Sequence, residues 1–168
     1  MRFRMANSDD LPMIKEMYGK IIEEMYKNDI KIWNEYYPCE CFLEDIELNR
    51  LFVLENDVEV VAACTLCNSN SGEDVIKWNE ETKDVWYIDR LGVNVNYLRQ
   101  GIGQALISNV KNYAKENGKK YLRLFVVDVN IPAIKLYEKA GFDILEGVYN
   151  EEVYEGHFLT EYAFELKV

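Results

Sequence analysis

The stretch Val-Asn-Val-Asn-Tyr-Leu-Arg-Gln-Gly-Ile-Gly-Gln-Ala-Leu, residues 93–106, joins a β-branched run to an amphipathic helical pattern. Gly101 and Gly103 remove two side chains where the backbone enters the helix, so bare amides can approach a ligand closely. The first N–H groups of a helix lack internal partners and lie at the positive end of its dipole. The stretch therefore predicts a binding site for a phosphate or pyrophosphate group.

A second motif follows at residues 130–142, which read Asn-Ile-Pro-Ala-Ile-Lys-Leu-Tyr-Glu-Lys-Ala-Gly-Phe. In this order and spacing, the two motifs resemble the GNAT superfamily of acetyl-CoA-dependent N-acetyltransferases. The family's phosphate signature, Gln/Arg-x-x-Gly-x-Gly/Ala, maps onto Leu98–Gly103 and departs from it at Leu98. Arg99 or Gln100 could supply the missing polar contact, whereas the amide cradle is backbone and does not depend on that side chain.

The resemblance covers nearly the whole chain and implies the GNAT acyl-CoA N-acyltransferase fold. This is an α/β (α+β) fold with a mixed, twisted sheet of about seven strands and helices on both faces. In that fold the sheet splays between the fourth and fifth strands, expected here at Val85–Val93 and Tyr121–Val127, and the pantetheine arm lies in the gap. Residues 1–168 are long enough for one domain with a sizeable core.

Periodicity and turn residues predict the element order β-α-α-β-β-β-α-β-α-β-β. Asn68–Asp84 is expected to be a long polar loop that could form a pocket wall. The predicted helices are Leu11–Tyr26, Cys39–Asn49, Ile102–Asn117 and a short one between Pro132 and Gly141. The predicted strands are Arg2–Ala6, Leu51–Glu55, Val58–Leu66, Val85–Val93, Tyr121–Val127, Phe142–Val148 and His157–Leu166.

The formal net charge is −11. Such an acidic chain is poorly suited to nucleic acid or to an anionic membrane, whereas a cationic substrate would be attracted. Solubility alone also accounts for the charge. Neither a secretory leader nor an apolar run of about 20 residues is present, so we expect a cytoplasmic protein. The sequence leaves open whether the chain forms a homodimer.

Four cysteines, Cys39, Cys41, Cys64 and Cys67, raise the question of a zinc site. An odd offset on a strand places Cys64 and Cys67 on opposite faces, and Cys39 and Cys41 lack the usual two-residue spacer, so we expect reduced thiols and no metal. His157 is the only histidine, which argues against a Ser-His-Asp or Cys-His enzyme.

The resemblance implies a set of acetyl-CoA contacts. Backbone groups of Leu91 and Val93 would bond the pantetheine arm and the thioester, and Asn130 would bond the pantetheine arm and help to start the following helix. Ala133 is small where the cofactor passes. The residues expected to bind the cofactor are Leu91, Val93, Leu98, Arg99, Gln100, Gly101, Ile102, Gly103, Gln104, Asn130, Ala133 and Tyr137.

Catalysis requires a neutral amine and protonation of the leaving thiolate. In the family, the tyrosine that matches Tyr137 points at the CoA sulfur and acts as the general acid; otherwise it is a buried aromatic. Many members carry a glutamate on the fourth strand near the position of Tyr87. Asp89 shares its strand face, so we favour Asp89 as base and Tyr87 as a group that orients substrate or water. Asp89 could instead pair with Arg90 or another cation, and the remaining alternative bases are Glu24, Glu80 and Glu81.

Aromatic side chains could line an acceptor pocket and contact a cation through their ring faces. The candidates are Trp33, Tyr36, Tyr37 and Trp78, with Tyr149 and Tyr154 in the last hairpin, and ordinary core packing explains each equally well. The expected function is transfer of an acetyl group from acetyl-CoA to a primary amine by direct attack in a ternary complex. The alternatives are use of another acyl-CoA, and a catalytically inactive CoA-binding sensor or interaction module.

Overall fold

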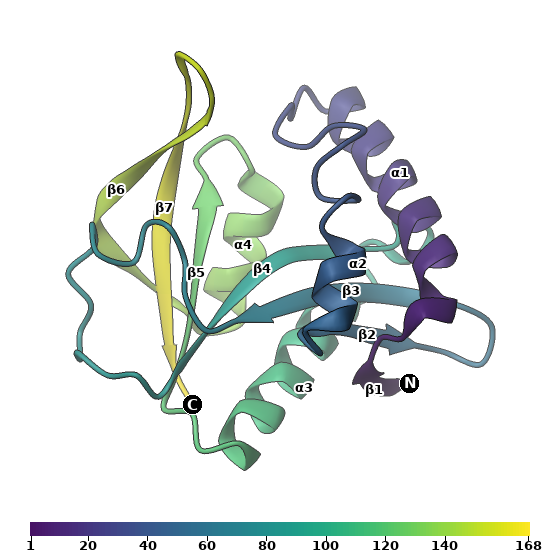
Figure 1. Ribbon diagram of the computed structural model, residues 1–168, viewed down its shortest axis with the longest axis horizontal. Coiled ribbons are helices and arrows are strands. Elements are labelled where there is room, and N and C mark those ends of the chain that lie inside the picture. Colours follow the sequence, from purple (N-terminus) through teal and green to yellow (C-terminus); the bar gives the residue numbers. More distant parts are fainter. The chain divides into compact units, whose positions relative to one another are not determined.

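The structure, a computed structural model, describes residues 1–168 and contains one mixed seven-stranded sheet with the strand order β1-β2-β3-β4-β5-β7-β6 (Figure 1). The helices are α1 (Leu11–Lys27), α2 (Phe42–Glu47), α3 (Ile102–Glu116) and α4 (Ile131–Lys139). The strands are β1 (Arg2–Met5), β2 (Leu51–Glu55), β3 (Val60–Cys67), β4 (Val85–Val93), β5 (Tyr121–Val127), β6 (Asp143–Tyr154) and β7 (His157–Lys167).

The chain divides into two compact units, each described here by itself. The first unit comprises Met1–Leu66 and Asp89–Asn109, and the second comprises Cys67–Ile88 and Val110–Val168. In the first unit β1 pairs with β2, and β2 pairs with β3, both antiparallel. In the second unit β4 pairs with β5 in parallel, whereas β5 with β7 and β7 with β6 are antiparallel.

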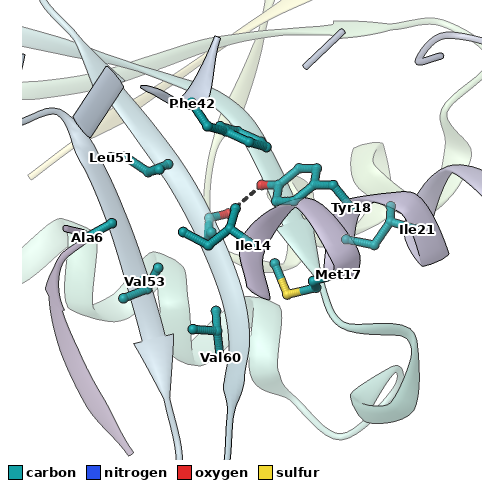
Figure 2. Packing of buried hydrophobic residues seen from close by; sticks show 10 residues of the cluster. Ala6, Ile14, Met17, Tyr18, Ile21, Phe42, Leu51, Val53 and Val60 are labelled. Atoms are coloured by element: carbon teal, nitrogen blue, oxygen red, sulfur yellow. Dashed lines mark hydrogen bonds between the residues drawn. The ribbon is translucent and has the colours of Figure 1, made fainter. Parts of the chain in front are cut away.

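The core of the first unit forms where α1 and α2 pack on β2 and β3 (Figure 2). Tyr18 is completely buried there, in edge-to-face contact with Phe42 at 4.6 Å between ring centroids. Its hydroxyl reaches the sheet, where the carbonyl of Ala63 lies 3.3 Å away. The cluster consists of Ala6, Ile14, Met17, Tyr18, Ile21, Phe42, Leu51, Val53, Val60 and Ala63.

Local signals in the sequence explain where the helices begin and end. Asn7 forms a capping box with Asp10, which satisfies the backbone amides of Asn7 and Asp9 in the short 3-10 turn that leads into α1. Gly118 adopts φ +71° after α3, and Gly141 adopts φ +90° after α4; both are left-handed conformations that favour glycine at a helix end. Pro132 lies in the first turn of α4, where a missing N–H costs nothing.

Two predicted elements were wrong in length, and β3 begins at Val60 where Val58 was predicted. The second helix is shorter than Cys39–Asn49 and spans Phe42–Glu47, because turn residues occupy both ends of that segment. The sixth strand is longer than Phe142–Val148, because β7 continues the antiparallel ladder as far as Tyr154. No helix is both long enough and apolar enough to cross a membrane.

Candidate acetyl-CoA site

The turn before α3 presents backbone amides. Arg99 has φ +61° and Gly101 has φ +79°, whereas Gln100 between them is not at positive φ, so the sign of φ alternates at the start of the helix. Such alternation directs successive N–H groups to one side and forms a concavity that binds anions. The carbonyl of Gly101 accepts the first hydrogen bond of α3, from the amide of Ala105 at 2.9 Å. The backbone amides of the first turn of a helix have no partner within that helix.

The side chain of Asn94, a residue that is 4% exposed, anchors the turn through hydrogen bonds. Its side-chain amide donates to Glu59 Oε2 at 3.1 Å and to the carbonyl of Val60 at 3.3 Å. Its side-chain oxygen accepts from the amide of Asn96 at 3.1 Å. One buried side chain therefore links the turn to the β2–β3 hairpin.

Tyr97 forms a second link. Its hydroxyl donates to Glu59 Oε1 at 3.1 Å and accepts from Asn56 Nδ2 at 3.0 Å. Gln100 donates from its side chain to the carbonyl of Asn96 at 3.1 Å. The sequence pattern drew attention to the glycines. Asn94 and Tyr97 earlier in the same stretch, together with Asn56 and Glu59 of the β2–β3 hairpin, also fix the shape of the turn.

The predicted phosphate-binding residues differ in exposure. Leu98, Arg99, Gln100 and Gly101 are exposed, Ile102 and Gly103 are buried, and Gln104 is half-buried. A Cβ atom added at Gly101 would meet nothing within 4 Å, so the outer side of the turn is open. An open concavity of amides fits a pyrophosphate group.

Strand β4 departs from regular extended backbone at Arg90, where φ is +53°. A residue with a side chain rarely adopts this conformation, which costs about 1–2 kcal/mol. The hydroxyl of Tyr18 donates to the carbonyl of Arg90. Two residues later, a Cβ atom on Gly92 would lie 2.8 Å from the ring of Tyr18, so only glycine fits against that ring.

The two β4 residues expected to contact the cofactor, Leu91 and Val93, are both half-buried. The amide of Asn94 donates to the carbonyl of Val61 on β3 at 2.9 Å. Because successive residues of a strand direct their backbone groups to opposite sides, the amide of Val93 points away from β3. This amide is thus oriented away from the antiparallel ladder of the first unit.

In the second unit, Asn130 and Tyr137 lie on α4. Asn130 caps this helix, as its side chain accepts from the amide of Ala133 at 3.4 Å. Tyr137 is 6% exposed, and its ring lies 5.7 Å from that of Phe142 and 6.1 Å from that of Phe164. The ring is therefore packed in the core of this unit, which fixes the direction of its hydroxyl. Ala133 is half-buried.

The candidate base Asp89 and the candidate orienting group Tyr87, both on β4, lie in different units. Tyr87, in the second unit, is 2% exposed, and burial raises the pKa of its hydroxyl. Of the neighbouring charged groups, Arg123 lowers this pKa and Glu73 raises it. Asp89, in the first unit, is half-buried. The hydrogen bonds of Arg90 to a carboxylate go to Asp45.

The alternative bases have surroundings of their own. Glu80 accepts from the hydroxyl of Tyr121 at 3.0 Å, and Lys120 lies 3.8 Å from its carboxylate. Glu24 lies 3.6 Å from Lys27, and Glu81 is exposed. These carboxylates have the partners or exposure of ordinary surface groups.

Trp78, expected as a substrate contact, is engaged within the second unit. Its indole N–H donates to the carbonyl of Glu73 at 2.7 Å, and its ring packs edge-on against Tyr87 and Phe125. The guanidinium carbon of Arg123 lies 4.3 Å from its ring centroid. The ring face that was expected to meet a substrate cation therefore meets a cation of the same chain.

Three of the other aromatic candidates, Trp33, Tyr36 and Tyr37, lie in the first unit. Trp33 packs on Tyr18 at 5.6 Å between centroids, and Tyr36 is 59% exposed. Tyr37 is 42% exposed as a residue, but its hydroxyl is buried beside Arg90, and burial raises its pKa to about 12. Of these three side chains, that of Tyr36 is the most exposed to solvent.

The cysteines are not in disulfides, and no three His, Cys, Asp or Glu side chains in residues 1–168 are placed to hold a metal ion. Cys64 and Cys67 are buried on β3, whereas Cys39 and Cys41 are half-buried.

Comparison with known proteins identifies related chains. An uncharacterized N-acetyltransferase of Methanocaldococcus jannaschii is 31% identical over 149 residues, which cover 86% of this chain and 62% of the relative. A probable N-acetyltransferase of Drosophila melanogaster, named san, is 28% identical over 128 residues, 74% of this chain and 64% of the relative. The chain thus spans less than two thirds of the length of these curated relatives.

Solved structures share the fold. A GNAT-family acetyltransferase of Streptococcus agalactiae superposes with a TM-score of 0.84 at 14% identity, covering 99% of this chain and 95% of that one. A Salmonella typhimurium acetyltransferase, solved with acetyl-CoA, gives 0.72 at 19% identity, covering 99% and 93%. The sequence model of the Acetyltransferase (GNAT) family matches residues 16–142, well over half of the chain. With the amide turn before α3 and the capped helix α4 in place, the chain belongs to the GNAT acetyltransferase family.

Proposed function

We propose that this protein is an N-acetyltransferase that moves the acetyl group of acetyl-CoA to a primary amine by direct attack in a ternary complex. The observation that carries the proposal is the turn at Leu98–Gln104, where Arg99 and Gly101 have positive φ and a Cβ added at Gly101 would meet nothing within 4 Å. Family membership supports the same activity. Acetyl-CoA supplies a thioester, whose carbonyl carbon accepts the amine and whose thiolate leaves.

The amides of residues 98–104 would bind the pyrophosphate. Leu98 stands where the family carries Arg or Gln, and the side chain of Gln100 is already bonded to Asn96. Arg99, exposed in the turn, is therefore the better source of a charged contact. Asn130 and Ala133 on α4 would contact the pantetheine arm.

The amides of Leu91 and Val93 on β4 would bond the pantetheine arm and the thioester carbonyl. A donor aimed at a developing oxyanion contributes about 2.7–4 kcal/mol to the stability of a transition state. The contacts of Arg90 hold this part of β4 in one conformation. A donor contributes in this way only when its direction is fixed before the reaction.

The amine must lose a proton before it attacks. For a lysine-like amine with a pKa near 10.4, neutrality at pH 7 costs about 4.6 kcal/mol. Asp89 would accept this proton, directly or through water. Tyr87 has a raised pKa, so it stays protonated at neutral pH and would orient the amine or a water molecule by hydrogen bonding.

Tyr137 would return a proton to the thiolate. A thiol with a pKa near 8.5 and a phenol with a pKa near 10 are close enough for proton exchange. Packing between Phe142 and Phe164 holds the phenol in place for this role.

The acceptor would be a small amine. The net charge of −11 favours a cation over an anion, and Trp33, Tyr36 and Tyr37 are the aromatic side chains of the first unit that would contact it. Trp78 would act through Tyr87 and Arg123, because its ring is already packed against both.

Thermal unfolding with acetyl-CoA, free CoA and ATP tests the cofactor site. Ligand at 100 times Kd adds about 2.7 kcal/mol, and each kcal/mol shifts the Tm of a domain of this size by about 2–4 °C. We expect a rise of about 5–10 °C with both CoA forms and little with ATP. No rise with either CoA form would contradict the proposal.

Two glycines provide a matched pair of variants. Gly101 and Gly118 precede and follow α3, both have positive φ, and an added Cβ would meet nothing within 4 Å at either. Gly101→Ala and Gly118→Ala should therefore lower stability to a similar extent, but only Gly101→Ala should weaken CoA binding. Equal CoA affinity in the two variants would place the phosphates elsewhere.

Thiol release with a panel of amines tests the chemistry. Tyr137→Phe should lower kcat far more than it changes the Kd of acetyl-CoA. Unchanged kcat would remove Tyr137 as the acid. CoA binding without thiol release for any amine would favour the alternative of a CoA-binding sensor, which the departure at Leu98 keeps open, and release with a longer acyl-CoA would favour another acyl donor.

A further inference from the structure

Arg90 is fixed through both its backbone and its side chain. Its φ of +53° is left-handed, and nothing in the residue type favours that conformation. The conformation is maintained by neighbouring groups of the first unit, which act on the carbonyl and on the guanidinium separately.

The carbonyl of Arg90 accepts from the hydroxyl of Tyr18, a completely buried residue of α1. The ring of Tyr18 also lies against Gly92, where an added Cβ would be 2.8 Å from Cζ. Figure 2 shows this side chain reaching from α1 to the sheet. Tyr18 therefore contacts β4 at two points on either side of Leu91.

The guanidinium of Arg90 is held by Asp45 of α2, whose side chain is 0% exposed. Nε donates to Oδ2 and Nη2 donates to Oδ1, each at 3.0 Å. Thr65 and Arg50 complete the shell of this carboxylate at 3.0 Å and 2.7 Å. Asp45 has no hydrogen-bonding capacity to spare and little room to move.

The orientation of the next amide follows from these contacts. The peptide bond between Arg90 and Leu91 is trans, so its carbonyl and its N–H point in opposite directions within one plane. Because the carbonyl points to Tyr18 on α1, the N–H of Leu91 points away from α1. Rotation of this peptide would break the bond to Tyr18. The bonds from the guanidinium to Asp45 separately restrict the movement of the Arg90 side chain.

We propose that Tyr18 and Asp45 are positioning residues: they hold Arg90 in the left-handed conformation so that the N–H of Leu91 donates to the carbonyl oxygen of the bound thioester. This inference rests on the proposed function. Neither residue touches the reacting atoms, and both act through the backbone of Arg90. The acetyl group should therefore add to the affinity for CoA, because free CoA lacks the carbonyl that accepts this bond.

Arg90→Gly and Arg90→Ala separate the conformation from the charge. Both remove the guanidinium, leave Asp45 with Arg50 and Thr65, and carry the same loss of the ion pair. Glycine adopts positive φ readily, whereas alanine does not. Isothermal titration with acetyl-CoA and with CoA gives the ratio of the two Kd values for each protein.

We expect the wild type to bind acetyl-CoA about five- to tenfold more tightly than CoA, which lies within the range for one hydrogen bond. Arg90→Gly should keep this preference within about twofold, and Arg90→Ala should reduce it to about one, with both binding CoA itself nearly as the wild type does. Tyr18→Phe keeps the ring on Gly92 and should also reduce the preference.

A direct readout is the ¹⁵N resonance of the Leu91 amide, which should shift with acetyl-CoA more than with CoA in the wild type and in Arg90→Gly only. Equal ratios in Arg90→Gly and Arg90→Ala, or a wild type that binds both ligands without preference, would overturn the inference while leaving the CoA site intact. A wild type that binds neither ligand would remove the proposed function, and this inference with it.

Discussion

Each unit buries an arginine–carboxylate pair, and the two pairs differ in how completely they are satisfied. Asp45 accepts four hydrogen bonds, two on each oxygen. Glu165 accepts from Arg123 through Oε2 at 2.7 Å, while its buried Oε1 has no partner. Asp45 joins residues distant in sequence, whereas Arg123 and Glu165 face each other on strands that the β5–β7 ladder already joins.

The comparison indicates that a buried ion pair contributes most to the stability of the fold where its residues are not already joined by the backbone hydrogen bonds of a β-ladder. Removing both charges with apolar side chains is often neutral or stabilising, whereas removing one leaves an unpaired buried charge. Asp45 cannot be replaced in this way, because three donors from three segments converge on it. The Arg123–Glu165 pair can be replaced, because the backbone holds its strands without it.

The largest effect should follow Asp45→Ala, which leaves Arg50, Arg90 and Thr65 without their acceptor. We expect a loss of about 3–5 kcal/mol in the free energy of unfolding, measured by urea denaturation. Glu44→Ala is the control, since this exposed carboxylate lies 3.4 Å from Arg50 and should contribute about 1 kcal/mol or less. Similar losses of unfolding free energy in both variants would mean that the buried hydrogen bonds of Asp45 stabilise the fold no more than an exposed ion pair does.

Arg123→Met should cost about 3–5 kcal/mol on its own, because Glu165 would remain buried without its partner. The double variant Arg123→Met with Glu165→Leu should recover most of that loss and unfold within about 1 kcal/mol of the wild type. A methionine at this position can still pack on the ring of Trp78. A double variant as unstable as the single one would show that the pair stabilises the second unit as Asp45 does the first.

Substitution of one glycine in each unit should have a smaller effect on stability and allows a further comparison of the two units. An added Cβ would lie 2.8 Å from Tyr18 at Gly92 and 2.7 Å from Tyr149 at Gly72. Tyr18 is buried and fixed by its hydroxyl, so Gly92→Ala should cost about 1–3 kcal/mol. Tyr149 is half-buried on β6 and can shift, so Gly72→Ala should cost less. Thermal unfolding of both variants gives the order, and the reverse order would contradict this account.

The smallest effect concerns a partly exposed pair. Arg4 donates to both oxygens of Asp10 at 2.7 and 2.8 Å, and this bonding lowers the pKa of the carboxyl below its usual range. Because the folded pKa lies below the unfolded value, the stabilisation is present above about pH 4 and is lost as the pH falls through the folded pKa. Asp10→Asn should cost about 1 kcal/mol at pH 7.

Urea denaturation at several pH values checks this sign. The difference in unfolding free energy between wild type and Asp10→Asn should shrink as the pH drops below about 4. A difference independent of pH would mean that the capping geometry, and not the charge, stabilises the start of α1.

The sequence predicted those features that local chemistry determines. The order of strands and helices, the caps at Asn130 and Gly118, and the glycine turn before α3 all follow from neighbouring residues. The extra length of β6 did not, because it depends on its partner β7. The engagement of Trp78 by Arg123 joins residues far apart in the chain.

The conformation of Arg90 also lacked a local signal, since left-handed backbone is expected at glycine or asparagine and not at arginine. The sequence also did not predict the hydrogen bonds of Asp45, because a carboxylate on a short helix is usually a surface group and its three partners lie on other segments of the chain. Both depend on long-range contacts that no pattern along the chain encodes.

The cysteines on β3 have a consequence for following how the chain opens. Cys64 belongs to the first unit and Cys67 to the second, and both side chains are buried. A thiol reacts with a labelling reagent only when its surroundings open, so the rate at which each sulfur is modified records the opening of its own unit. Two thiols on one strand thus report the opening of the two units separately, and the half-buried Cys39 and Cys41 should be modified faster.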